Sequence, residues 1–149
     1  MTWKKEIEEL KKREKLAEAM GGPEKLQRQK DNNRLNIRER IDLLLDKDSF
    51  HEIGKIAGKA DYDEKGELKN FVPSNFVMGR GNINGRKVVV GGDDFTVRGG
   101  AADASIAQKQ IMAEQLANEY RLPLIRLIEG TGGGGSVKSL DMDARTYIP

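Results

Sequence analysis

Two glycine-rich turns constrain the fold of this chain more than any other feature of its sequence. Gly99–Gly100 precedes an alanine-rich stretch, residues 101–120, that is typical of a helix. A predicted strand at 94–97 comes before that turn, and a second predicted strand at 124–128 runs into the glycines of residues 130–135. A strand–helix–strand crossover places its two strands parallel. We therefore expect both turns at one edge of the sheet, where open α/β sheets bind ligands.

The N-terminal region, residues 1–50, is rich in charge and is expected to be helical. One apolar stripe at helical spacing ends at Gly21-Gly22-Pro23, and Asn36 with Glu39 predicts a capping box at the start of another helix. The stripe comprises Trp3, Ile7, Leu10, Ala17 and Met20, and the buried face of the later helix comprises Ile37, Ile41, Leu44 and Leu45. We expect these helices to pack on a partner surface rather than to hold a site.

The region after residue 50 changes to the period of strands. Asn84-Gly85, between segments 76–83 and 86–90, predicts a two-residue type I′ hairpin. Val88-Val89-Val90 is typical of a core strand, and residues 61–66 indicate a polar turn near the boundary. The expected domains are a helical segment at 1–50 and the first part of an α/β domain at 51–149.

Composition excludes several classes of protein. The 149 residues suit one domain, and the absence of cysteine excludes disulfides and thiol-ligated metal sites. The net charge is +2, with basic and acidic residues interleaved, which argues against a nucleic-acid-binding stripe. No run of about 20 apolar residues predicts a membrane span, and the charged start does not resemble a secretion signal. We expect a soluble, cytoplasmic protein.

Glycine turns at a strand edge present backbone N–H groups that can bind an anion, either a phosphate or the oxyanion of a polarised carbonyl. Residues 130–135 satisfy the dinucleotide pattern G-x-G-x-x-G literally, although four consecutive glycines satisfy many patterns. A Walker A loop is excluded because Val137 precedes Lys138. A flexible linker is the alternative interpretation of the same glycines.

Several segments, in order, resemble the carboxyltransferase (β) subunit of biotin-dependent acyl-CoA carboxylases such as propionyl-CoA carboxylase. The resemblance covers nearly the whole chain and implies a crotonase-like α/β fold of ββα units, incomplete here and preceded by the helical segment. The segments that carry it are Arg38–Asp46 with Ser49-Phe50, Gly79–Arg86, Asp94–Gly100, Gln108-Lys109 and Leu122–Ile125.

The resemblance implies transfer of a carboxyl group from N-carboxybiotin to the α-carbon of an acyl-CoA. It assigns the oxyanion hole for the thioester enolate to backbone N–H groups of Gly132 and Gly133, after Thr131. It also places Arg98, Gly99 and Gly100 at the CoA thioester, and it requires no metal. The run of four glycines departs from the family's usual two, which shifts the donor by one or two positions.

The same resemblance implies biotin as the cofactor, on a separate carrier domain or subunit. The implied partners are an acyl-CoA, the biotin carboxyl carrier and biotin carboxylase components, and further copies of the chain. Family members have two related domains over several hundred residues, so we expect a fragment without turnover of its own. The alternatives are the carboxyltransferase subunit of a biotin-dependent decarboxylase and a non-catalytic nucleotide- or CoA-binding module. Acyl-chain length and reaction direction are not encoded in these residues.

Five other polar residues also have structural interpretations. Asp93-Asp94 is expected to form a turn or cap, because neighbouring strand residues face opposite ways. His51 is expected at the surface. Arg98 can contact either a CoA phosphate or a surface carboxylate, and Glu129 can either orient the glycine turn or serve as a structural partner.

Overall fold

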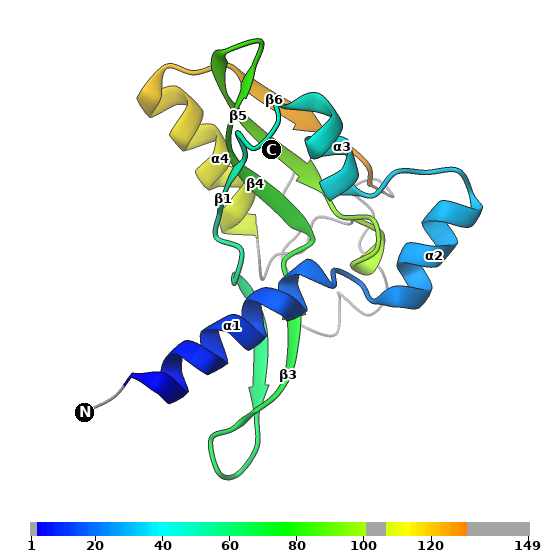
Figure 1. The fold of residues 1–149 in the computed structure, drawn as a ribbon, viewed down its shortest axis with the longest axis vertical. Coiled ribbons are helices and arrows are strands. Elements are labelled where there is room, and N and C mark those ends of the chain that lie inside the picture. Colours follow the sequence, from blue (N-terminus) through cyan, green and yellow to red (C-terminus); the bar gives the residue numbers. More distant parts are fainter. Residues whose placement is uncertain (1–2, 101–106, 131–149) are drawn as a thin grey trace.

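The computed structural model describes residues 3–100 and 107–130, and it consists of an α/β body from which an arm projects (Figure 1). The arm is formed by the first helix and a β-hairpin that lie side by side. In chain order the elements are α1 (Lys4–Glu18), α2 (Pro23–Asp31), α3 (Ile37–Leu44), β1 (His51–Ile53), β2 (Gly58–Tyr62), β3 (Leu68–Pro73), β4 (Phe76–Ile83), β5 (Arg86–Asp93), the 3-10 turn η1 (Arg98–Gly100), α4 (Ala107–Tyr120) and β6 (Leu124–Leu127).

The body is built on a four-stranded sheet with the order β1-β4-β5-β6. β4 and β5 form an antiparallel hairpin through Asn84 (φ 49°) and Gly85 (φ 76°), which confirms the predicted type I′ turn. β5 and β6 are parallel, with Val89 opposite Leu124, and α4 connects them. A parallel strand–helix–strand crossover is therefore present, but its first strand is β5 and not the predicted segment 94–97. The carboxyl ends of β5 and β6 lie at one edge of the sheet.

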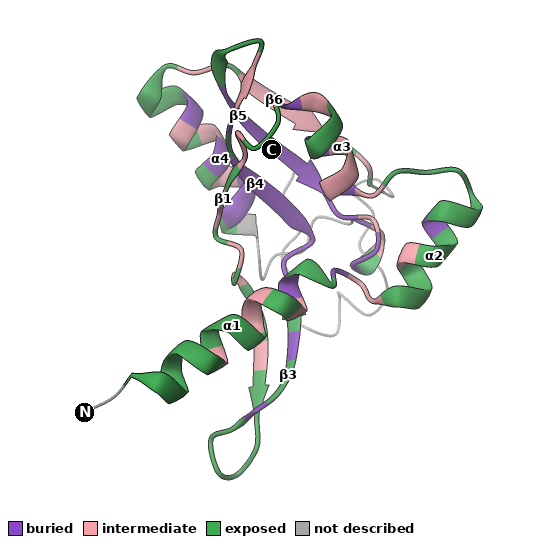
Figure 2. Ribbon diagram, in the orientation of Figure 1, coloured by how far each residue is buried: buried purple, intermediate pink, exposed green. Residues whose placement is uncertain are grey.

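The two faces of the sheet carry separate apolar cores (Figure 2). On one face α3 packs through Ile37, Ile41 and Leu45, as its capping box and spacing predict. On the other face α4 packs through Ala113 and Ala117. The sheet residues of the first core are Val77, Val88 and Val90, and those of the second are Phe76, Met78 and Val89.

The buried face of α4 is not the face that carries most of its large apolar side chains. Met112 and Tyr120 are exposed, whereas Ala113 and Ala117 are buried against the sheet. Small side chains allow the helix to approach the sheet closely, so volume decides which face is buried here. Met112, Leu116 and Tyr120 recur at helical spacing in the sequence and suggest a buried face, but only Leu116 of the three packs partly against the core.

The predicted strand at 94–97 is wrong, because β5 continues to Asp93 and a turn follows. The Asp94 carboxylate accepts hydrogen bonds from the Thr96 backbone N–H (2.9 Å) and hydroxyl (2.6 Å), which closes that turn. Gly91 and Gly92 lie within β5. A Cβ on Gly91 would stand 2.6 Å from the Phe76 ring, so this glycine serves packing rather than a bend.

Two elements of the N-terminal half have no counterpart in the prediction. α2 begins at Pro23, directly after the Gly21-Gly22 turn that ends the first helix. β2 and β3 form an antiparallel hairpin whose tip is the predicted polar turn at 61–66. Ala17 of α1 packs with Leu68 and Phe71 of β3, which attaches the helix to the hairpin and forms the arm.

Candidate functional site

The first glycine turn meets Glu129 and Gly130, where the second turn begins, at the edge where β5 and β6 end. Gly100 has a positive φ of 64°, and a Cβ built on it would lie 2.2 Å from the carbonyl oxygen of Glu129 and 3.3 Å from the Cα of Gly130. Only a residue without a side chain allows this approach. The convergence expected from the sequence is confirmed as far as Gly130, the last residue described at this end.

Three carboxylates fix the backbone around the meeting point. The Glu129 backbone N–H donates to Asp93 (3.2 Å), and the Glu129 side chain forms an ion pair with Arg40 of α3 (3.4 Å). Burial raises the pKa of Asp93 and of Asp94, while the Thr96 hydrogen bonds oppose the shift at Asp94. Asp94 closes the turn after β5, as expected from the sequence. Glu129 bonds to Asp93 at the end of β5 through its backbone and to Arg40 of α3 through its side chain.

The α1–α2 connection docks on the turn that follows β5. The Gly21 N–H donates to the Thr96 hydroxyl (2.9 Å), and a Cβ on Gly21 would lie 2.1 Å from the Thr96 carbonyl oxygen. The same hydroxyl donates to the buried Asp94 carboxylate. This contact between backbones fixes the start of α2 beside the sheet edge.

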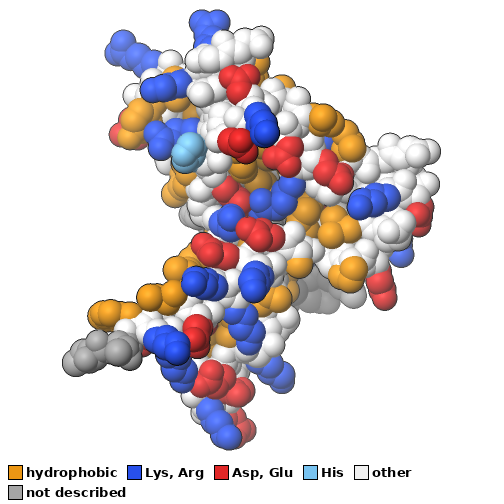
Figure 3. Space-filling model, in the orientation of Figure 1, with side chains coloured by type: hydrophobic (Ala, Val, Ile, Leu, Met, Phe, Trp, Pro, Cys, Tyr) orange, Lys and Arg blue, Asp and Glu red, His pale blue; other side chains and the backbone are white. Residues whose placement is uncertain are grey.

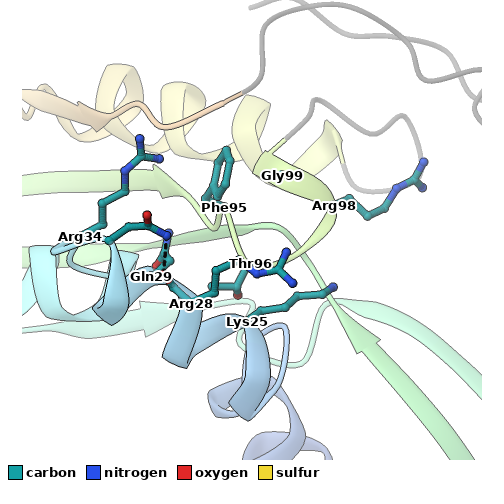
Figure 4. A pocket seen from close by; sticks show the side chains of 9 residues that line it. Lys25, Arg28, Gln29, Arg34, Phe95, Thr96, Arg98 and Gly99 are labelled. Atoms are coloured by element: carbon teal, nitrogen blue, oxygen red, sulfur yellow. Dashed lines mark hydrogen bonds between the residues drawn. The ribbon is translucent and has the colours of Figure 1, made fainter.

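A cavity of about 270 Å³ lies between α2 and this turn (Figure 4). Lys25 and Arg28 enter it from α2, and in the view of Figure 4 the Phe95 ring stands between Arg34 and Arg98. The other lining residues are Gln29, Asn32, Thr96 and Gly99. Four basic side chains around one hollow attract an anionic ligand. The N-terminal segment, expected to hold no site, therefore supplies one wall of this cavity.

The structure places only part of the predicted site. Arg98 and Gly99 line the cavity, and Gly100 lies at the contact with Glu129. Thr131, Gly132 and Gly133 lie outside the described residues, so their assignment stays a prediction. His51 is exposed at the start of β1, as expected. The α2 contribution was missed, although Pro23 after two glycines is a helix-start signal in the sequence.

Residues 3–100 and 107–130 contain no group of three or more histidine or carboxylate side chains placed to hold a metal ion. Within those same ranges no helix has the length and apolar character needed to cross a bilayer.

Comparison with known families gives a match over most of the chain. Residues 28–145 match the model of the carboxyl transferase domain. The chain belongs to the carboxyl transferase domain family. That match begins within α2 and includes both glycine turns, so the edge described above lies inside the family region.

Relatives with known names agree with this membership. The chain is 35% identical over 126 residues to the propionyl-CoA carboxylase beta chain of Cereibacter sphaeroides, covering 85% of this chain and 25% of that protein. It is 36% identical over 128 residues to the mitochondrial methylcrotonoyl-CoA carboxylase beta chain of Arabidopsis thaliana, covering 85% of this chain and 21% of that protein. The chain thus spans about a quarter of the length of these relatives.

Solved structures show the same fold. The transcarboxylase 12S structure, described as a hexamer assembly with methylmalonyl-coenzyme A and methylmalonic acid bound, matches with a TM-score of 0.76 and 29% identity. The match covers 95% of this chain and 28% of that chain. The expected fold class, a partial crotonase-like α/β domain preceded by a helical segment, is confirmed by this likeness.

Proposed function

We propose that this chain forms part of a carboxyltransferase that moves a carboxyl group between a biotin carrier and the α-carbon of an acyl-CoA. The observation that supports the proposal best is the contact between Gly100 and Glu129-Gly130 inside the family region. It brings the first glycine turn to Gly130, the start of the second, and supports a site at this edge where main-chain N–H groups receive a negatively charged oxygen.

The reaction needs stabilisation of an enolate. Removing the α-proton of a thioester leaves negative charge on the thioester oxygen, and fixed N–H donors aimed at that oxygen lower the barrier. One such donor is worth roughly 2.7–4 kcal/mol. In this proposal Gly132 and Gly133 donate from the second turn, while Gly99 and Gly100 line the thioester arm. Neither role requires a nucleophilic side chain or a metal ion.

Carboxybiotin enters this scheme as a substrate carried by another domain or subunit. None of the contacts described above assigns a residue of this chain to biotin. Partner components and further copies of the chain belong to the same proposal, supported by the hexamer named for transcarboxylase 12S and by the relatives' names.

The test uses the enzyme assembled with its biotin carrier. Gly132→Val or Gly133→Val replaces a glycine of the donor turn, and we expect kcat to fall by about 10²–10³-fold while binding of the CoA ester is largely kept. Gly66→Asn is the matched control, because Gly66 sits at the exposed hairpin tip where a Cβ meets nothing and asparagine tolerates a positive φ. Unchanged turnover in both valine variants would contradict the oxyanion role.

The two alternative functions predict different results in experiments on the same assembled enzyme. A decarboxylase subunit would form the acyl-CoA and carboxybiotin from a carboxylated CoA ester faster than the reverse. A non-catalytic nucleotide-binding module would bind NAD or ATP tightly and a CoA ester weakly, which is measured by titration calorimetry. That last result would overturn the proposal.

A further inference from the structure

Glu129 is the last residue before the second glycine turn, and both its backbone and its side chain are attached to the body. Its backbone N–H donates to the Asp93 carboxylate at the end of β5 (3.2 Å), and its carbonyl oxygen lies against Gly100. Its two carboxylate oxygens bond to different helices. Oε1 accepts from Gln29 of α2 (3.4 Å), and Oε2 pairs with Arg40 of α3 (3.4 Å). One residue therefore joins β5, the first glycine turn and two helices.

The Arg40–Glu129 ion pair is long and partly exposed. Its N···O distance of 3.4 Å exceeds the about 2.7–2.9 Å of a close charge-assisted bond. The two side chains are 27% and 20% exposed, and ion pairs in contact with water contribute little to folding stability. The pair nevertheless links helix α3 to the entry of the glycine turn, across 89 positions of the chain. Its place in the fold therefore indicates a role in orienting that turn.

Arg38, on the same helix, forms an ion pair of a different character. Its guanidinium donates to both carboxylate oxygens of Glu52 on β1, at 2.8 Å and 3.0 Å. The Glu52 side chain is only 7% exposed, so this pair is close, bidentate and buried on one side. β4 and β5 lie between β1 and β6, which places Glu52 on the strand at the opposite edge of the sheet from β6. Helix α3 thus carries one pair suited to stability and one pair at the candidate site.

Backbone donors stabilise a transition state only when they are held in the right place. A misplacement of about 1 Å can lower a rate by about 10²-fold, even when its cause lies far from the chemistry. In the proposed function the donors are Gly132 and Gly133, which follow Glu129 within four residues. Glycine has wide backbone freedom, so the composition of the turn does not by itself fix the donors. The direction in which the chain enters the turn is set at Glu129.

We infer that Arg40 and Glu129 are positioning residues for carboxyl transfer. Arg40 holds the Glu129 side chain, and Glu129 holds the start of the second glycine turn against β5 and Gly100. The backbone N–H groups that follow are thereby aimed at the thioester oxygen. Neither side chain has to touch the substrate, since both act through the backbone. The inference rests on the proposed function for the identity of the reaction, and it gives α3 a part in catalysis beyond packing on the sheet.

The first test compares Arg40→Met with Arg38→Met in the enzyme assembled with its biotin carrier. Methionine removes the charge of either arginine and keeps an unbranched apolar side chain. Arg40→Met should lower kcat by about 10–10²-fold with little change in the KM for the CoA ester, because the donors act in the transition state. Its midpoint of urea unfolding should hardly shift.

Arg38→Met should show the reverse, a clearly lower urea midpoint and a normal kcat of the folded enzyme, because it breaks the closer and more buried pair. Arg38→Lys replaces it as the control if Arg38→Met does not fold. An unchanged kcat in Arg40→Met, or equal losses of kcat in Arg40→Met and the Arg38 control, would overturn the inference.

The second test asks whether Arg40 acts through Glu129. Glu129→Gln removes the charge of the carboxylate and keeps its shape. If the two residues act together, the double variant Arg40→Met with Glu129→Gln should lose no more kcat than the worse single variant. Arg40→Lys, which keeps the charge, should retain most of the kcat. Losses that multiply in the double variant would show independent effects and contradict the role.

A third measurement separates this inference from the proposed function. Amide hydrogen exchange of the peptide that contains Glu129 is followed by mass spectrometry, relative to a peptide of β4 in the same sample. The Glu129 N–H bonds to Asp93, so this peptide should exchange several-fold faster in Arg40→Met and no faster in the Arg38 control. Equal exchange in wild type and Arg40→Met would overturn the inference, whether or not the enzyme is active. If the wild type transfers no carboxyl group, the proposed function fails, while exchange still decides whether Arg40 holds this backbone.

Discussion

Two helices of the N-terminal segment, α1 and α3, each carry an apolar stripe at helical spacing, but their surroundings differ. α3 buries Ile37 and Ile41 against the sheet, each about 1% exposed. α1 also carries an apolar stripe, but Trp3 is 70% and Ile7 is 48% exposed. Figure 3 shows hydrophobic side chains exposed along the arm. Only the last turns of α1 and the residues after it, with Ala17 and Met20, reach a core.

The difference shows what helical periodicity can and cannot predict. The spacing of apolar residues identifies the face that avoids water, and it does so correctly for α3. It does not identify the surface that covers this face. α3 has the sheet for a partner, whereas the first half of α1 contacts the hairpin through the exposed Lys5–Glu67 ion pair and leaves its apolar side chains in solvent.

The largest expected effect compares matched isoleucines on the two helices. Ile41→Ala leaves a cavity between α3 and the sheet, and we expect it to lower the free energy of unfolding by about 3 kcal/mol. Ile7→Ala on α1 removes a side chain that is already half in solvent, so its effect should stay below about 0.5 kcal/mol. Urea unfolding followed by circular dichroism measures both. Similar losses would mean that the α1 stripe is covered in solution.

A second prediction concerns buried charge in the body, where Lys109 of α4 is only 6% exposed and Arg38 of α3 pairs with Glu52 (2.8 Å). Burial lowers the pKa of Lys109 to about 8, with Arg38 adding to the effect and Glu52 opposing it. Between pH 8 and the ordinary lysine value the unfolded chain binds more protons than the folded one, so stability rises with pH.

The measurement compares wild type with Lys109→Met at two pH values. From pH 7.5 to pH 9.5 the free energy of unfolding of the wild type should rise by about 2 kcal/mol relative to the variant. Subtracting the variant cancels the other titrating groups, which are the same in both proteins. Parallel pH profiles would show that Lys109 titrates normally in the folded state.

The smallest effect concerns how the two helices begin. Asn36 caps α3 by accepting from the Glu39 N–H (3.0 Å), while Glu39 accepts from the Asn36 N–H (2.9 Å). Trp3, at the same position of α1, makes no side-chain cap bond. Asn36→Ala should cost about 1 kcal/mol in urea unfolding, and Asn36→Asp should cost much less because aspartate also caps. Equal losses in both variants would exclude the cap as the cause.

Local signals in the sequence predicted local structure well. The capping box at Asn36, the Asn84-Gly85 turn and the parallel crossover are each set by interactions within a few residues or by chain handedness. The errors occurred where a distant neighbour decides. Gly91 and Gly92 look like a strand end in the sequence, but they make room for Phe76 from β4 and for Ile37 from α3. The buried face of α4 likewise depends on sheet residues far away in the chain.

The candidate site, like the fold, could be predicted from the sequence only in part. The meeting of the glycine turns could be predicted because parallel strands end at one edge. The cavity could not, since its walls come from Arg28 and Phe95, which no spacing rule connects. Gln29 carries no signal of its own in the sequence, because glutamine is common on exposed helices. Its Oε1 is buried without a hydrogen-bond partner only in the folded structure, where the chain before α2 contacts Thr96.

The contact between Gly21 and Thr96 matters for anyone who redesigns this protein. The backbones of Gly21 and Thr96 are in direct contact, and the Thr96 hydroxyl bonds to both Gly21 and Asp94. The segment that includes α1 and Gly21 therefore cannot be removed or exchanged without loss of these contacts. A truncated protein that starts after residue 22, or one with another N-terminal segment, would lose the Gly21–Thr96 contact that holds α2 beside the cavity. Variants made for crystallisation or solubility should keep this junction intact.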